Sequence, residues 1–167
     1  MVYQPSPTVE KFLVKAASRR RFTVLLASES PRKSEETPYA YLRKKLNSAK
    51  VNTIVITGPG ATAYMPKVNK LILGANTLLA SGGVIAESGA TILALAAHEL
   101  GKPVIVLGGV FQISPTNPAD GASLMDWGGP SSIAKFSDGA VVDGVEVENA
   151  ITDYIPPHLV DVIITNL

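Results

Sequence analysis

Short runs of apolar, often β-branched residues recur along the chain and predict the strands of a buried sheet. Several of these runs are apolar at nearly every position, which is typical of strands covered on both faces. We expect strands at residues 23–27, 51–56, 71–73, 104–107 and 160–165.

Between these runs the apolar positions repeat every three to four residues, which predicts helices at residues 8–18, 38–48 and 87–100. Thr8 is the expected N-cap of the first helix, and Gly101 the expected end of the third. Alternating strands and helices predict a Rossmann-like, doubly wound α/β fold with a mainly parallel sheet and helices on both faces. A ligand would bind beyond the carboxyl ends of such strands.

The length of 167 residues predicts one domain spanning residues 1–167. Residues 111–139 are rich in Pro, Gly, Ser and Asp, and we interpret them as a long connection within that domain. The chain opens on a short polar lead and stops on the apolar run VDVIITNL. Because natural termini often end in polar residues, we expect a fragment of a longer protein.

Composition narrows the possible partners. Lys and Arg total 15 against 14 Asp and Glu, so no overall field marks a nucleic-acid or membrane-surface binder. The absence of Cys excludes disulfides, thiolate nucleophiles and Cys-based zinc sites. No apolar run reaches the roughly 18 residues that span a bilayer. We therefore expect a soluble, intracellular protein without direct nucleic-acid or membrane contacts.

Two basic clusters stand out against this balance. Lys15 with residues 19–21 forms one cluster, and residues 43–45 form the other. A solvated face is the default interpretation of both clusters, and contact with an acidic partner is the alternative.

Two short motifs resemble enzyme signatures, but the residues around them do not fit those signatures. GPGATA at residues 58–63 matches a dinucleotide fingerprint, but Pro66 leaves room for only a short helix, and no acid ends the next strand. A glycine turn is therefore favoured over a dinucleotide site. His98 and Glu99 begin HELGK, where a zinc-peptidase motif would need a second His at Lys102. No G-x-S-x-G elbow supports a serine nucleophile.

Residues 68–109 carry a wider resemblance, in the stretch VNKLILGANTLLASGGVIAESGATILALAAHELGKPVIVLGG. This stretch resembles the alpha, beta and delta regulatory subunits of eukaryotic initiation factor 2B, which share a fold with isomerases of methylthioribose 1-phosphate and ribose 1,5-bisphosphate. Residues 111–118 (FQISPTNP) and 152–166 (TDYIPPHLVDVIITN) look most like the beta subunit. Family members carry a further N-terminal helical domain, which this chain lacks; that agrees with the expected fragment.

The resemblance allows the glycine-bearing loop to be compared with the isomerases. The isomerases have G-A-D where this chain has Gly74, Ala75 and Asn76, and an amide cannot replace the Asp in proton transfer. Their N-K is matched by Ala86 and Glu87, so a carboxylate stands where a Lys would face a phosphate. Each lost charge-assisted bond costs roughly 1.5 to 3 kcal/mol. We expect a remnant sugar-phosphate pocket without catalysis, formed by Asn76, Ser81, Gly82, Gly83, Glu87 and Gly89.

The resemblance implies a cytoplasmic, non-catalytic, beta-like regulatory subunit of the guanine-nucleotide exchange factor for initiation factor 2, without cofactor or metal. Its role would be subunit assembly and the sensing of substrate phosphorylation. The implied partners are delta-like and alpha-like sister subunits, the catalytic subunits of the exchange factor, and initiation factor 2 itself. The expected interface residues are Ile92, Leu95, Phe111, Ile113 and Pro115.

Two enzymatic alternatives stay open at this point. A sugar-phosphate isomerase would need the family's catalytic Cys, which by the resemblance would lie upstream of this chain. A dinucleotide enzyme would bind its cofactor at GPGATA.

Overall fold

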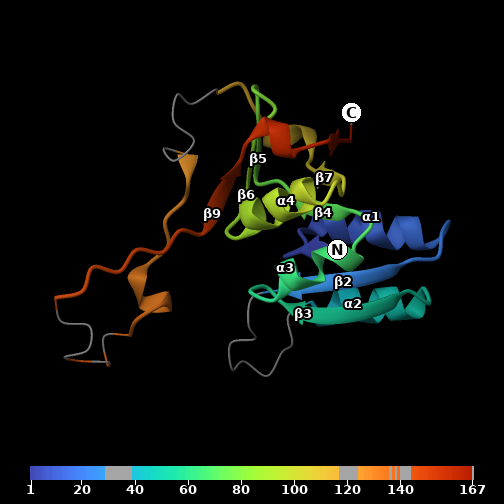
Figure 1. The fold of residues 1–167 in the computed structure, drawn as a ribbon, viewed down its shortest axis with the longest axis horizontal. Helices are drawn as coiled ribbons and strands as arrows, with labels where there is room; N and C mark the ends of the chain where they lie inside the picture. Colours follow the sequence, from blue (N-terminus) through green and yellow to red (C-terminus); the bar gives the residue numbers. More distant parts are fainter. Residues whose placement is uncertain (29–38, 117–123, 136, 138, 140–143, 167) are drawn as a thin grey trace.

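A six-stranded parallel sheet forms the centre of the computed structural model, which describes residues 1–28, 39–116, 124–135, 137, 139 and 144–166 (Figure 1). The strand order is β10-β7-β4-β1-β2-β3, and every neighbouring pair is parallel. The strands are β1 (Val2–Tyr3), β2 (Thr23–Ser28), β3 (Asn52–Thr57), β4 (Leu71–Gly74), β7 (Val104–Leu107) and β10 (Val162–Ile164).

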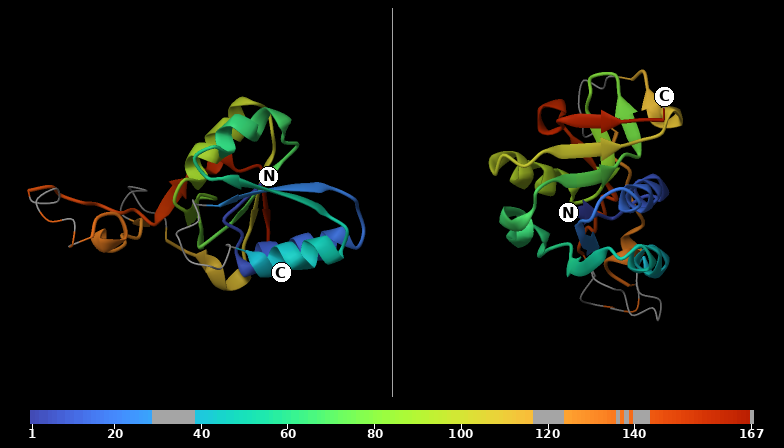
Figure 2. Two further views of the ribbon diagram at one scale, coloured as in Figure 1. Left: turned by 90° about the horizontal axis from the view of Figure 1, so that it is seen from below. Right: turned by 90° about the vertical axis from the view of Figure 1, so that its right-hand side faces the viewer.

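Helices cover both faces of this sheet, as Figure 2 shows. One layer consists of α1 (Pro7–Ala17) and α2 (Ala40–Ser48); the other contains α3 (Ala61–Tyr64), η1 (Met65–Lys67) and α4 (Ala90–Glu99). Each layer buries its own apolar cluster, which confirms the predicted doubly wound sheet. The α1–α2 side includes Val9, Leu13, Leu42 and Leu46, and the α4 side includes Met65, Leu73, Leu93 and Val106.

A second, four-stranded sheet was not predicted. It has the order β8-β5-β6-β9, with antiparallel pairing of β6 to both β5 and β9. Its strands are β5 (Thr77–Leu79), β6 (Val84–Glu87), β8 (Ile113–Ser114) and β9 (Thr152–Ile155). The prediction that the third helix starts at residue 87 is therefore wrong. Glu87 ends a strand, because the buried run Val84–Ala86 pairs with β9, and the helix begins at Ala90.

The chain start also differs from the prediction. Residues 2 and 3 form the central strand β1, which pairs with both β2 and β4, instead of a polar lead. Two residues are too few to show a strand period. The predicted N-cap Thr8 is wrong, because the helix begins at Pro7 and Thr8 lies inside it. The N-cap of α1 is Ser6, whose Oγ accepts from Val9 N at 3.4 Å.

The remaining predicted elements are confirmed with small shifts in their bounds. Pro38 of the predicted second helix, and Asn117 and Pro118 of the predicted interface loop, lie outside the described residues. Short 3-10 turns complete the chain: η2 (Val110–Gln112), η4 (Pro130–Ser132) and η6 (Pro157–Leu159). Across the described ranges, no helix is long and apolar enough to cross a membrane.

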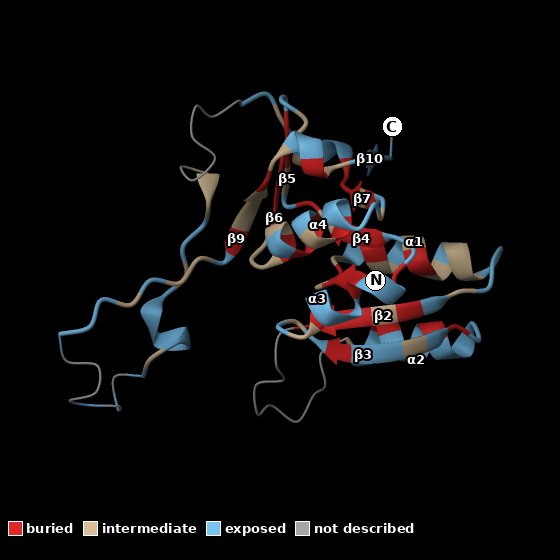
Figure 3. Cartoon of the chain, viewed as in Figure 1, coloured by how far each residue is buried: buried red, intermediate tan, exposed pale blue. Residues whose placement is uncertain are grey.

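Residues 124–135 of the predicted long connection form, together with residues 144–151, an arm that extends from the body (Figures 1 and 3), whereas residues 111–114 belong to η2 and β8 in the body. The base of the arm is a pair of antiparallel segments, in which Gly128 N donates to Asn149 O at 2.7 Å and Ile151 N donates to Asp126 O at 2.9 Å. Trp127 and Ala150 form an isolated bridge between these segments. The arm leaves the body next to β9, at the carboxyl edge of the central sheet.

Candidate functional site

The candidate site lies at the topological switch point between β1 and β4. The chain winds outward from β1 to β3 and then from β4 to β10, so this is where such a sheet opens a crevice. Gly74 ends β4, and a Cβ there would lie only 2.7 Å from Ser6 Oγ. A glycine is therefore needed where the start of α1 approaches the strand, and Asn76 follows as an exposed residue just beyond the carboxyl end of β4.

Asn76 and Glu87 contact each other at this point. Asn76 N donates to Ile85 O at 2.7 Å, and its side-chain Nδ2 donates to Glu87 Oε1 at 3.4 Å. The predicted replacement of an Asp by Asn and of a Lys by Glu thus gives an amide facing a carboxylate. This pair carries net negative charge and offers no cation to a phosphate.

The amino end of α4 is held by a second carboxylate. Asp153 Oδ2, from β9, accepts from Gly89 N at 2.7 Å and from Thr91 N at 3.3 Å. Thr91 Oγ1 also donates to Tyr154 O at 3.0 Å. Helix amides of this kind are the groups that bind phosphates in α/β proteins, and here a side chain of the protein uses them.

Gly89 is required by its surroundings as well as by its backbone. Its φ is +91°, and a Cβ would lie 2.6 Å from Tyr3 Oη. Tyr3 Oη in turn donates to Ser88 O at 2.6 Å and accepts from Gln4 Nε2 at 3.0 Å. The start of α4 is therefore fixed against the end of β1.

Ser81, Gly82 and Gly83 lie elsewhere, in the turn of the β5–β6 hairpin. Gly82 N donates to Leu79 O at 2.9 Å, and Leu79 N donates to Gly83 O at 2.9 Å. The hairpin separates this turn from Asn76 by three strand residues, or about 10 Å. The structure thus brings together Asn76, Glu87 and Gly89 and leaves the other three predicted pocket residues apart.

Sequence reasoning missed Tyr3, Gln4 and Asp153. Tyr3 and Gln4 lie in the segment interpreted as a polar lead, and Asp153 is 64 residues from the amide that it caps. The signal in the sequence was an acid placed inside the strand-like segment TDYI. Such a residue needs a polar partner, although its position along the chain does not identify that partner.

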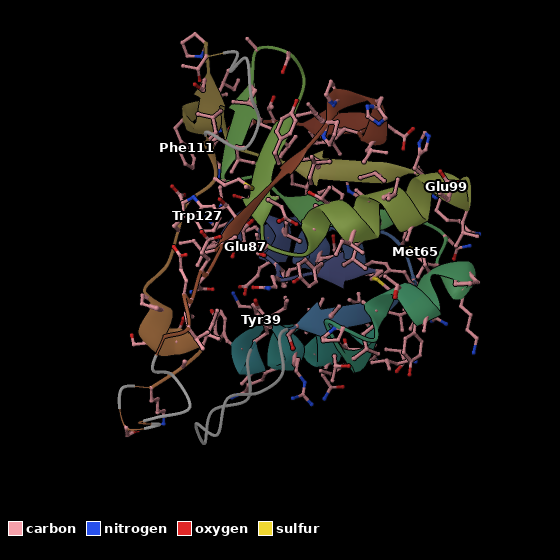
Figure 4. All side chains as sticks on the ribbon, turned by 60° about the vertical axis from the view of Figure 1, so that its left-hand side comes forward. Tyr39, Met65, Glu87, Glu99, Phe111 and Trp127 are labelled. Atoms are coloured by element: carbon pink, nitrogen blue, oxygen red, sulfur yellow. The ribbon has the colours of Figure 1, made fainter. Side chains whose placement is uncertain are left out.

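All five predicted interface residues are exposed. Ile92 and Leu95 are 63% and 49% exposed on the outer side of α4, while Phe111 is 84% and Ile113 is 48% exposed. Pro115 is exposed beyond β8. Figure 4 shows Phe111 well away from Glu87. The interface residues on α4 and those at residues 111–115 lie on different parts of the molecule. Helix α4 packs on β9 and η1, whereas β8 pairs with β5 at the opposite edge of the second sheet from β9.

Comparison with known proteins places this geometry in a family. The chain is 40% identical over 162 residues to "Translation initiation factor eIF2B subunit beta" of Schizosaccharomyces pombe, covering 97% of this chain and 41% of that protein. It is 30% identical over 131 residues to a ribose 1,5-bisphosphate isomerase of Haloterrigena turkmenica, covering 73% of this chain and 40% of that protein.

A solved structure gives the same result. A chain of the tetrameric eIF2B-beta2-delta2 complex from C. thermophilum superposes with a TM-score of 0.78 at 48% identity, over 98% of this chain and 48% of that one. The chain thus spans less than half the length of these relatives. Because the model of the initiation factor 2 subunit family matches residues 1–167, the chain belongs to that family.

Proposed function

We propose that the chain acts in a non-catalytic, beta-like regulatory subunit of the cytoplasmic guanine-nucleotide exchange factor for initiation factor 2. The higher identity to the eIF2B beta subunit than to the isomerase supports this assignment. The contact between Asn76 and Glu87 carries the non-catalytic part, since the amide of Asn76 cannot exchange a proton and so does not complete an acid and base pair with Glu87 for sugar isomerisation.

The charge at the switch point supports the same proposal. Glu87 and Asp153 both lie around the amino end of α4, where an isomerase would need to hold a phosphate. Two carboxylates oppose a dianion, and the helix amides nearest to it already have an acceptor. The site keeps the architecture of a sugar-phosphate pocket with the opposite charge.

The proposed partners are a delta-like and an alpha-like sister subunit, the catalytic subunits of the exchange factor, and initiation factor 2. The C. thermophilum relative was solved with delta in a beta2-delta2 tetramer. We assign the contact with sister subunits to the exposed apolar residues of α4 and of residues 111–115. Helix α4 is apolar on its outer as well as its inner side, which is typical of helices covered in an assembly.

Co-expression with a delta-like subunit tests the proposal. The expected result is a stable complex of full-length protein, detected by size-exclusion chromatography with light scattering. Failure to associate with any family subunit would exclude the assignment. The phosphorylation-sensing role is tested in the reconstituted exchange factor, by comparing the inhibition caused by phosphorylated substrate with and without this subunit.

The alternative is a sugar-phosphate isomerase, favoured by the identity to the Haloterrigena turkmenica protein. Full-length protein should then convert ribose 1,5-bisphosphate or methylthioribose 1-phosphate, with turnover followed by NMR. We expect no turnover. If turnover is found and Asn76→Ala abolishes it, the regulatory assignment fails.

A further inference from the structure

The charges of this chain are divided unevenly between its two parts. The first 50 residues hold eleven Lys and Arg against four Asp and Glu, a net charge of +7. Residues 51–167 hold four Lys and Arg against ten Asp and Glu, a net charge of −6. The overall charge of +1 therefore hides a strongly polarised molecule.

The fold gathers the positive charge on one face. Helices α1 and α2 contact each other on the same side of the sheet, and Figure 2 shows them side by side. Nine exposed cations lie on these helices or directly after them, and we call them the basic face. They are Lys11, Lys15, Arg19, Arg20, Arg21, Arg43, Lys44, Lys45 and Lys50.

Little in the described structure neutralises the basic face. Glu10 is the acid that α1 contributes, in its first turn, and α2 contributes none. Glu29, Glu35 and Glu36 lie outside the described residues. The one cation of this face with a described side-chain contact is Lys45, whose Nζ lies 4.1 Å from the centroid of the Tyr41 ring. Clustered like charges repel each other, so an acidic partner would stabilise this face.

We propose that the basic face is a docking surface for an acidic segment of a partner protein. It lies on the opposite side of the sheet from α4, so this inference goes beyond the proposed function and does not rest on it. Helix α1 is about 16 Å long, the span of roughly five extended residues. A short run of Asp and Glu therefore matches the size of the face.

The aromatic residues favour a peptide over a nucleic acid. Binding of single strands needs open aromatic rings on which bases stack. Tyr41 is the one exposed aromatic ring of the described α1 and α2 helices, and Lys45 Nζ lies over one of its faces, while Tyr39 is half-buried. A single ring does not provide a series of stacking platforms. The acidic remainder of the chain would also repel a polyanion that extends beyond the face.

Fluorescence anisotropy with a labelled peptide of about six glutamates, which matches the size of the face, tests the proposal at about 50 mM salt, where exposed charges are weakly screened. The test variant is Arg43→Glu with Lys44→Glu. The matched control, Lys67→Glu with Lys70→Glu, makes the same change of charge at exposed lysines outside the basic face, at the end of η1 and just before β4. A second variant, Arg19→Glu with Arg20→Glu, tests the segment that follows α1.

We expect both basic-face variants to weaken peptide binding at least about tenfold and the control to weaken it less than about twofold. All substituted side chains are exposed, so thermal unfolding should confirm folded protein in each case. Equal weakening by test and control variants, or no binding to the unsubstituted protein, would overturn the proposal. So would tighter binding of a single-stranded oligonucleotide of equal charge, which would assign the face to nucleic acid.

Discussion

The two helical layers that cover the central sheet bury similar apolar inner sides and differ on their outer sides. Helices α1 and α2 present Lys and Arg to solvent, while α4 presents Ile92 and Leu95. A charged outer side favours exposure of the helix to water, whereas covering an apolar outer side stabilises the complex that covers it. The two faces of one sheet therefore present different kinds of surface, one charged and one apolar.

The layers also differ in how their helices are anchored. Ser6 caps α1 from the adjacent residue, in a bond of 3.4 Å. The start of α4 is held by Tyr3 and Asp153, which are 85 and 64 residues away from the groups that they bind. The start of α4 therefore depends on long-range hydrogen bonds, and the start of α1 on a local one.

Gly89→Ala should give the largest effect, because the new Cβ would collide with Tyr3 Oη at a positive φ. We expect a loss of roughly 2 to 4 kcal/mol in the free energy of unfolding, measured by urea denaturation. Gly101→Ala is the matched control at the other end of α4, with φ +60° and open space around the Cβ. It should cost about 1 kcal/mol. Equal losses would show that the contact with Tyr3 does not anchor α4.

Ile92→Glu tests whether the outer side of α4 is an interface. Ile92 is 63% exposed, so the folded chain should tolerate Glu, while association with a delta-like subunit should weaken about 10- to 100-fold. Tyr41→Glu on α2 is the matched control at 65% exposure, and it should change the affinity less than about twofold. Analytical ultracentrifugation of the mixed subunits measures both. If the control is as damaging as Ile92→Glu, the two layers do not differ in this function.

Asp153→Asn should remove the charge that caps α4 while keeping an oxygen acceptor. We expect a loss of about 1 to 2 kcal/mol in the free energy of unfolding. Hydrogen exchange of the Gly89 and Thr91 amides should become faster, because Asp153 Oδ2 accepts from both of them. Unchanged protection of these amides would contradict the proposed cap.

Ser6→Ala should have the smallest effect, about 0.5 to 1 kcal/mol, since it removes one long local bond at the start of α1. Urea denaturation of Ser6→Ala and Asp153→Asn under the same conditions measures both losses in the free energy of unfolding. A larger loss at Ser6 than at Asp153 would reverse the order of the two anchors.

The central sheet and its helical layers could be predicted, because buried parallel strands and amphipathic helices leave a period in the sequence. The second sheet could not be predicted in the same way. The short, mostly apolar run at residues 84–87 is compatible with a loop or with the start of the following helix. Its pairing with β9 makes it a strand. Local pattern carries no information on such distant pairing.

The chemistry of the candidate site could be predicted only in part. The family pattern directed attention to Asn76 and Glu87, which contact each other. The family pattern also suggested that residues 81–83 share a pocket with Asn76 and Glu87. In the structure, residues 81–83 form the turn of the β5–β6 hairpin, at the opposite end of the hairpin from Asn76 and Glu87. Asp153 was missed because its role depends on tertiary contact rather than on a motif.

The position of β1 has a consequence for synthesis of the protein. This strand comes first along the described chain but lies inside the sheet, and Met1 N bonds to the carbonyl of Lys70, 69 residues later. At roughly 5 to 20 residues per second, a ribosome would need about 3 to 14 s to supply that neighbour. During that interval one edge of β1 has no partner strand, so nascent chains should be most prone to misassembly before β4 emerges.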